Sequence, residues 1–273
     1  MHDETLPSAA RRRPRCVRLR LGRVSDPAQV EASAIGAAFA TMSQTAAAVQ
    51  EIFGKGLLPS SLEIADSFTL EAARKDLGKA IVPPGDAHLL VDFDGQEESV
   101  RSEAEAVRQL LADKKPNALE MATGEEDCEK LWDLRRQFSN SLRATGLTKL
   151  NQDVVVPRSR IVDLIDFAES LHAKYGFPIA CFGHAGDGNI HINIMADRYN
   201  RDGAVREKVE RALDDLFAQV LAWGGVITGE HGIGLAKKRW WPDATSEPVR
   251  ELHRKLKDVL DPNGILNPGK FVD

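Results

Sequence analysis

The sequence predicts an α+β fold in which helices flank a ferredoxin-like antiparallel sheet. Between residues 148 and 228 the spacing of apolar residues gives the order strand, helix, strand, strand, helix, strand, which is the ferredoxin-like order. Two loops, one within this stretch and one directly after it, combine glycine with histidine and carboxylate side chains. Because this order places the helices on one face and brings both loops to one edge of the sheet, we expect a polar site there.

The composition is that of a folded protein with an uneven distribution of charge. The 273 residues, 42% of them hydrophobic, are sufficient to bury a core. Residues 1–29 contain seven arginines against three acids, so the net charge of −5 leaves −9 on the remainder. An acidic body argues against nucleic acid as a partner. No apolar run approaches the roughly 20 residues that cross a bilayer, so no transmembrane segment is expected.

The chain is predicted to consist of an N-terminal arm, residues 1–29, and one domain over residues 30–273. The arm is rich in arginine and has no helical periodicity, so it is either disordered or the remnant of a missing upstream domain. Its acidic residues argue against a transit peptide. Cys16, Cys128 and Cys181 are far apart and form no CxxC motif, which favours a reducing, cytoplasmic location.

The first half of the domain begins with helical spacing. Apolar residues recur at intervals of three and four over residues 30–53, so we predict a helix there. A short strand follows over residues 57–64, and another over residues 88–93 ends at an Asp-Gly turn. Residues 97–113 form an amphipathic helix. His88 is isolated, and we interpret it as satisfied or solvated rather than as a ligand.

The second half alternates more regularly between helical and strand patterns. The predicted elements are helices over residues 125–144, 158–175, 204–223 and 247–260, and strands over residues 148–156, 178–182, 190–194 and 225–228. The basic and aromatic run at residues 235–241 is interpreted as a helix that packs its tryptophans while its charges stay in solvent.

The motif C-F-G-H-A-G-D-G-N-I-H-I-N-I-M, residues 181–195, contains the first candidate site. Its second strand alternates, so its isoleucines lie on one face and His191 and Asn193 on the other. His184 stands seven residues before His191 in a glycine-rich loop, and a tight turn there would bring both imidazoles together. Two histidines alone do not define a metal site.

A second glycine-bracketed motif, G-G-V-I-T-G-E-H-G-I-G at residues 224–234, supplies a carboxylate. Glu230 would complete a set of two histidines and one carboxylate with an open position. That set is expected for a catalytic divalent transition metal such as zinc, manganese or iron. His231 would then stand beside the metal without binding it. The sequence therefore predicts a metal site made of His184, His191 and Glu230.

These two motifs and the run L-D-P-N-G-I-L-N-P-G-K, residues 260–270, together resemble one family. The chain resembles the C-terminal (cap) domain of FAD-linked oxidases of the vanillyl-alcohol-oxidase type. Within that family it is most similar to D-lactate dehydrogenases, the D subunit of glycolate oxidase and D-2-hydroxyglutarate dehydrogenases. The resemblance covers about residues 30–273. It implies FAD as cofactor and a flavin-binding domain or subunit as partner, because the flavin-binding half of the family is absent and the chain alone would be inactive.

The resemblance also implies substrate-binding residues. Arg135 and Ser139 lie four apart on one face of a predicted helix, where a solvated surface would otherwise be expected. The family places an arginine and a hydroxyl there to bind the substrate carboxylate. Lys149 matches a substrate-binding lysine of the family after a shift of one residue. The tail that contains Asn267 returns to the flavin domain in the family, which implies that Asn267 contacts the cofactor.

The implied reaction is oxidation of a small D-2-hydroxy acid, of the D-lactate, glycolate or D-2-hydroxyglutarate type, to the 2-oxo acid. The metal would act as a Lewis acid, His231 would be the general base, and Asn193 would orient the substrate. Hydride would pass to FAD. Two alternatives stay open: a metal-dependent hydrolase that activates a metal-bound water, and a non-catalytic metal-binding module left after loss of the flavin domain.

Overall fold

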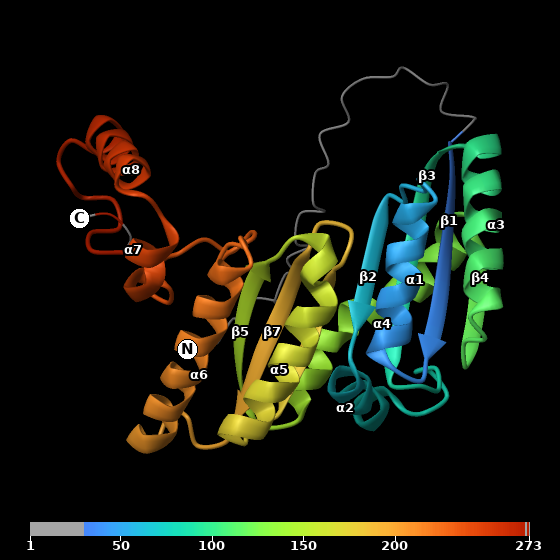
Figure 1. Ribbon diagram of the computed structural model, residues 1–273, viewed down its shortest axis with the longest axis horizontal. Coiled ribbons are helices and arrows are strands. Elements are labelled where there is room, and N and C mark those ends of the chain that lie inside the picture. Colours follow the sequence, from blue (N-terminus) through green and yellow to red (C-terminus); the bar gives the residue numbers. More distant parts are fainter. Residues whose placement is uncertain (1–29, 271, 273) are drawn as a thin grey trace, which may run out of the picture.

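The computed structural model describes residues 30–270 and residue 272 (Figure 1). The predicted arm at residues 1–29, with Cys16, lies outside the described residues. The strands are β1 (Val30–Phe39), β2 (Ser61–Ala65), β3 (Ala87–Gln96), β4 (Ala118–Thr123), β5 (Thr148–Val155), β6 (Ile179–His184) and β7 (Asn189–Ala196). The helices are α1 (Met42–Gly54), α2 (Ser67–Leu77), α3 (Glu97–Asp113), α4 (Glu125–Ala144), α5 (Ile161–Tyr175), α6 (Gly203–Ala222), α7 (Trp241–Ala244) and α8 (Glu247–Leu260).

The strands form one seven-stranded antiparallel sheet in the order β4-β1-β3-β2-β6-β7-β5. This order consists of two ferredoxin-like units joined edge to edge. The first unit is β4-β1-β3-β2, and the second is β6-β7-β5 with an isolated bridge from Val155 to Val226 in the fourth position. The pairing of β2 with β6 joins the units. The predicted ferredoxin-like α+β class is confirmed, and the sheet contains this arrangement twice.

Helices cover both faces of the sheet, whereas the sequence predicted helices on one face. The main core lies under α1, α3, α5 and α6 and contains the isoleucines of β7. On the other face, Leu70 of α2 and Phe138 of α4 pack against Phe182 and Met195. α4 crosses this second face, since it contacts β1 of the first unit and β5 of the second. His191 and Asn193 point to the same side as Met195, so the candidate site belongs to the face that α2 and α4 cover.

The prediction of a helix over residues 30–53 is wrong for its first part, which is strand β1. β1 lies between β3 and β4 with both faces buried, so its sequence shows no alternation of polar and apolar residues. Ile35 belongs to the main core, and Ala34 packs on the other face with Cys128 of α4. A Cβ added to Gly36 would lie 3.4 Å from the side chain of Leu131, so small residues on β1 leave room for α4.

Three further elements differ from the sequence prediction. The apolar pattern does not predict α2, although Asp66 is its N-cap and accepts a hydrogen bond from the backbone N–H of Thr69. It does not predict β4, an edge strand in which only Ala122 is buried. The strand expected over residues 225–228 is reduced to a bridge. A Cβ on Gly225 would lie 2.3 Å from the carbonyl oxygen of Val155, so only glycine allows this close approach.

Helix α8 lies apart from the sheet (Figure 1). A 3-10 turn, η3 (Lys238–Trp240), and α7 replace the helix expected over residues 235–241. The predicted packing of tryptophan is confirmed, because Trp240 lies edge-to-face on Phe217 with 4.7 Å between ring centroids, and Trp241 is buried. α8 forms as predicted. Its apolar residues are all exposed: Val249, Leu252, Leu256, Val259 and Leu260.

Within residues 30–270 and residue 272, no helix combines the length and the apolar content that crossing a bilayer requires.

Gly183 of β6 is predicted to be intolerant of alanine. A Cβ at this position would lie 2.5 Å from the carbonyl oxygen of Asn189 and 2.9 Å from the Cα of Ile190. Because both are backbone atoms, the strands would have to separate, and we expect Gly183→Ala to lower the free energy of unfolding by about 2 kcal/mol. Urea unfolding followed by circular dichroism measures this loss.

Gly186→Ala is the matched control, because a Cβ there would make an ordinary contact at 3.7 Å from Leu62. Equal unfolding midpoints for the two variants would contradict the packing of β6 on β7.

Candidate metal and substrate site

A buried carboxylate lies where the two units join. Glu63 of β2 stands opposite His184 of β6 and is only 1% exposed. Its Oε1 is 2.5 Å from His184 Nδ1, and its Oε2 accepts a hydrogen bond from Arg135 Nε at 2.8 Å. Burial alone would raise the pKa of this carboxyl, but the hydrogen bond from His184 and the charge of Arg135 outweigh it and lower the pKa to about 2.

The three predicted metal ligands come together. One ligand atom from each of His184, His191 and Glu230 lies within 4.8 Å of the other two. The two histidines stand on the neighbouring strands β6 and β7, with ring centroids 5.8 Å apart. Glu230 approaches from the loop after α6, with its Oε1 3.8 Å from His191 Nε2, and is 53% exposed. The group is therefore enclosed on the sheet side and open on the side of Glu230.

The two histidines of this group have opposite electrostatic environments. Burial, followed by the charges of Arg135 and His184, lowers the pKa of His191 to about 3, so this ring is neutral. The hydrogen bond to Glu63 raises the pKa of His184 against the effect of burial. Among the described residues, His191 Nδ1 is buried without a hydrogen-bond partner. A neutral imidazole is the form that binds a metal, so His191 is prepared for that role.

A second buried carboxylate, Asp153 of β5, holds the loop that carries Glu230. It stands opposite His191 in the sheet. Its Oδ2 accepts backbone N–H hydrogen bonds from Gly229 at 3.0 Å and from Glu230 and His231 at 2.8 Å each. The buried ammonium of Lys237 donates to its Oδ1. These hydrogen bonds outweigh burial and hold the pKa of Asp153 well below its usual range.

His231 lies next to the group of His184, His191 and Glu230 without belonging to it. Its ring is stacked on His191, with 5.5 Å between centroids and 20° between planes. Its Nδ1 lies 3.6 Å from Asp153 Oδ1, and its Nε2 lies 3.7 Å from Glu230 Oε1. The side chain is 45% exposed, so one side of the ring is accessible.

Two of the predicted substrate-binding residues, Arg135 and Lys149, lie over the ring of Phe182, and a third, Ser139, bonds to Lys149. The guanidinium carbon of Arg135 lies 4.8 Å from the ring centroid, and Lys149 Nζ lies 5.5 Å from it. Lys149 Nζ donates a 2.7 Å hydrogen bond to Ser139 Oγ. Burial, then the charges of Arg143 and Arg135, lowers the pKa of Lys149 to about 8. Arg135 uses only Nε in hydrogen bonds to described residues, so both its Nη groups are available to an anion.

Asn193 and Asn267 lie differently from the other predicted residues. Asn193 is fully buried, and its Nδ2 donates to the carbonyl oxygens of Ala180 and His191 at 3.0 and 3.2 Å. Its Oδ1 has no hydrogen-bond partner among the described residues. Asn267 follows α8 in the chain, outside all seven strands of the sheet, and has a left-handed backbone with φ of 48°. The structure therefore does not bring Asn267 to the metal group.

Sequence reasoning missed Glu63, Asp153 and Lys237. Glu63 lies in the run S-L-E-I-A, and Asp153 stands before three valines. An isolated acid inside an apolar strand is a signal of a buried, partnered carboxylate. Lys237 lies in a basic run and has no comparable signal. His88, interpreted as satisfied or solvated, is buried and lies edge-to-face with Phe138 at 6.2 Å.

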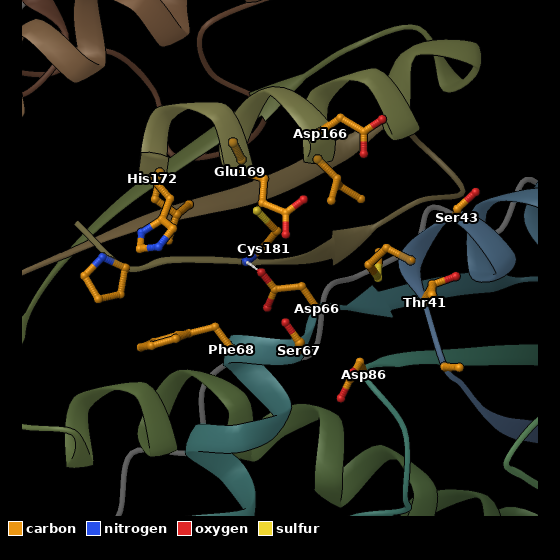
Figure 2. A pocket seen from close by; sticks show the side chains of 16 residues that line it. Thr41, Ser43, Asp66, Ser67, Phe68, Asp86, Asp166, Glu169, His172 and Cys181 are labelled. Atoms are coloured by element: carbon orange, nitrogen blue, oxygen red, sulfur yellow. Dashed lines mark hydrogen bonds between the residues drawn. The ribbon is translucent and has the colours of Figure 1, made fainter. Parts of the chain in front are cut away.

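A separate cavity of about 640 Å³ lies on the face of β6 that bears Cys181, opposite to the face that bears His184 (Figure 2). Asp66 lines this cavity and accepts a 2.7 Å hydrogen bond from the backbone N–H of Cys181. Its polar lining includes Asp66, Asp86, Asp166, Glu169 and His172. Cys181 is a buried core residue, as predicted. None of the predicted site residues lines this cavity.

Residues 29–271 match the family model for FAD linked oxidases, C-terminal domain. The chain belongs to this family. The FAD-linked oxidase domain is 32% identical to glycolate oxidase subunit GlcD of Bacillus subtilis over 86% of this chain. It is 30% identical to a D-lactate dehydrogenase of Anaerostipes hadrus over 82% of this chain. The domain spans about half the length of these curated relatives, 50% and 49% respectively.

Solved structures agree with this assignment at the level of the fold. The FAD-linked oxidase domain superposes on 4-ethylphenol oxidase from Gulosibacter chungangensis with a TM-score of 0.61 and 15% identity, covering 90% of this chain and 54% of that chain. It superposes on p-cresol methylhydroxylase with a TM-score of 0.60 and 13% identity, covering 88% and 52%. At these identities the likeness shows the fold alone.

Asp153→Asn is predicted to destabilise the domain by roughly 3 kcal/mol at pH 7, because it leaves the buried Lys237 ammonium without its partner. The native pKa of Asp153 is depressed, so its stabilisation is present above the unfolded pKa of about 4 and is lost as pH falls further. The difference between variant and wild type should therefore shrink below about pH 4. Urea unfolding at several pH values measures it.

The double variant Asp153→Asn with Lys237→Met should recover part of the loss, because it removes the unpaired charge. If the two side chains do not interact, the loss of stability in the double variant equals the sum of the losses in Asp153→Asn and Lys237→Met. That additive result would contradict the prediction.

Proposed function

We propose that this domain is the substrate- and metal-binding part of an FAD-dependent oxidoreductase that oxidises a small D-2-hydroxy acid to the 2-oxo acid. D-lactate, glycolate and D-2-hydroxyglutarate are the candidate substrates. The main support is that the group of His184, His191 and Glu230 lies near two cations, Arg135 and Lys149. The first group would bind the substrate hydroxyl oxygen through a metal, and the two cations would bind the substrate carboxylate. Membership of an FAD-linked oxidase family and relatives named as glycolate oxidase subunit and D-lactate dehydrogenase agree with it.

The donor set fits a divalent transition metal such as zinc, manganese or iron. His184 and His191 offer imidazole nitrogens, Glu230 offers a carboxylate oxygen, and the open side next to Glu230 has room for a substrate oxygen. When bound, the metal supplies Lewis acidity to the substrate hydroxyl, and FAD bound to the flavin domain accepts the hydride.

His231 is proposed as the general base. Its Nε2 is on the side of Glu230 and receives the hydroxyl proton, while Nδ1 faces Asp153. Stacking on His191 and the hydrogen bond from the His231 backbone to Asp153 hold the ring in place. The negative charge of Asp153 stabilises the imidazolium that forms.

Arg135 and Lys149 are proposed to bind the substrate carboxylate, with Ser139 holding Lys149 in position. The free Nη groups of Arg135 suit a carboxylate, which accepts two parallel hydrogen bonds from a guanidinium. The ring of Phe182 beneath both cations excludes water from that side. Asn193 is proposed to orient the substrate from behind His191 through its unpartnered Oδ1.

A flavin-binding domain is proposed to cover the exposed apolar face of α8 and the following tail. Leu252 and Leu256 are more than half exposed on the helix, and Ile265 and Leu266 are also exposed. Apolar side chains grouped on an isolated helix are typical of a surface that another domain covers. Asn267, in the same tail, is then in a position to contact FAD. In this proposal residues 30–273 form the cap domain.

The purified chain should carry about one equivalent of a divalent transition metal, and His191→Ala should lose it. Elemental analysis after dialysis measures the metal content. His172→Ala is the matched control, because His172 bonds to the carbonyl oxygen of Phe177 and lies outside the metal group. Equal metal content in His191→Ala and wild type would exclude the proposed site.

Once a flavin partner is present, His231→Asn should reduce kcat by about 100-fold or more, a common loss for a general base. Arg135→Met should act mainly on KM, because the substrate carboxylate has the same charge in the ground and transition states. Steady-state kinetics with D-lactate, glycolate and D-2-hydroxyglutarate measure both effects.

Arg136→Met is the matched control for Arg135, because Arg136 is exposed and pairs with Glu129 and Asp133. A KM in Arg135→Met no higher than in Arg136→Met would remove Arg135 from the substrate site. Metal-dependent hydrolysis of an ester without flavin would favour the hydrolase alternative instead.

A further inference from the structure

Glu63 contacts one residue from each half of the proposed site. Its Oε1 meets His184, a proposed metal ligand, and its Oε2 meets Arg135, proposed to bind the carboxylate. Ser61 Oγ also donates to Oε1 at 3.1 Å. With 1% exposure the carboxylate has almost no access to water, so these partners satisfy it.

The contact with His184 determines which ring nitrogen is available to a metal. An ionised carboxylate only accepts hydrogen bonds, so His184 Nδ1 must carry a proton to bond with Glu63. In the neutral ring that proton leaves Nε2 with its lone pair free, and Nε2 is then the ligand atom. A carboxylate bonded to the far nitrogen of a metal-binding histidine is a recurrent arrangement that orients the ring and increases its basicity.

The contact with Arg135 determines how the guanidinium is presented. Glu63 takes the Nε–H at 2.8 Å, and the cation rests 4.8 Å from the centroid of Phe182. Neither Nη group makes a hydrogen bond to a described residue. One carboxylate therefore orients the group for the hydroxyl end of a 2-hydroxy acid and the group for its carboxylate end.

We propose that Glu63 is a positioning residue that holds His184 with Nε2 toward the metal and Arg135 with its Nη groups toward the substrate carboxylate. This inference rests on the proposed function. Glu63 is not needed merely to join β2 to β6, because backbone pairing and the hydrogen bond from Cys181 to Asp66 also join them. Burying an ionised side chain in a strand is costly. Here the cost is offset by the contacts of Glu63 with His184 and Arg135, both of which are residues of the proposed site.

The test is the zinc affinity of Glu63→Gln in the full chain, measured by competition with a fluorescent zinc chelator. Glutamine has nearly the same shape, but it has one acceptor oxygen and would turn an amide donor toward His184 or Arg135. We expect zinc binding to weaken by about 10-fold to 100-fold, as is usual for a lost carboxylate partner of a ligand histidine.

Two controls separate positioning from folding. Asp66→Asn alters another buried carboxylate, which directly follows β2 and accepts a hydrogen bond from β6, away from the metal group. Arg135→Met breaks the same ion pair but leaves the bond from Glu63 to His184. Both should bind zinc within about two-fold of wild type or more tightly, since loss of Arg135 removes a positive charge near the site. Weakening in Asp66→Asn equal to that in Glu63→Gln would overturn the inference.

A second measurement does not need the metal. The ¹⁵N chemical shifts of His184 in zinc-free chain, at alkaline pH where the ring is neutral, should show Nδ1 protonated in wild type and a mixture of tautomers in Glu63→Gln. Unchanged tautomer and unchanged zinc affinity in Glu63→Gln would overturn the role of Glu63 while leaving the metal site intact. A wild-type chain that binds no zinc would overturn the metal site and this inference together.

Discussion

The antiparallel pairing of β2 with β6 is the interaction on which the rest of the structure depends. It makes residues that lie 121 positions apart in sequence, Glu63 and His184, direct cross-strand neighbours. It also joins the two ferredoxin-like units into one continuous sheet, and α4 crosses this sheet from β1 to β5. Arg135 reaches Glu63 because this surface is continuous, so the polar site is a product of the way the two units meet.

The site is a diagonal row of titratable side chains across four strands. From β2 to β5 the row is Glu63, His184, His191 and Asp153, a carboxylate at each end and two imidazoles between them. Glu63 pairs with His184 and Asp153 pairs with His191, whereas His184 stands opposite Asn189, two residues before His191. Each carboxylate is buried, and each is kept ionised by a cation, Arg135 at one end and Lys237 at the other. His184 is thereby held by a charge that the sheet itself carries, while Glu230 and His231 come from a loop that Asp153 holds at the other end of the row.

The sequence predicted the parts of this arrangement that have a local signal. Strict alternation in β7 gave the correct face for His191, and glycine on both sides of Glu230 indicated a loop able to approach it. β1 was missed because a strand buried on both faces has no alternation, and its alanines favour a helical interpretation. Glu63 was missed because its contact with His184 depends on the pairing of β2 with β6, which the local sequence pattern does not identify.

The joined sheet also determines whether either unit can exist by itself. β2 and β6 would each be an edge strand of a separate ferredoxin-like sheet, with unpaired N–H and C=O groups along one side. β2 is only five residues long and carries a buried acid, whereas β6 contains the apolar run from Ile179 to Phe182. A fragment ending before β5 or beginning with it would expose one of these edges to other chains. We therefore regard the two units as one folding and expression unit, in which each half protects the other from aggregation.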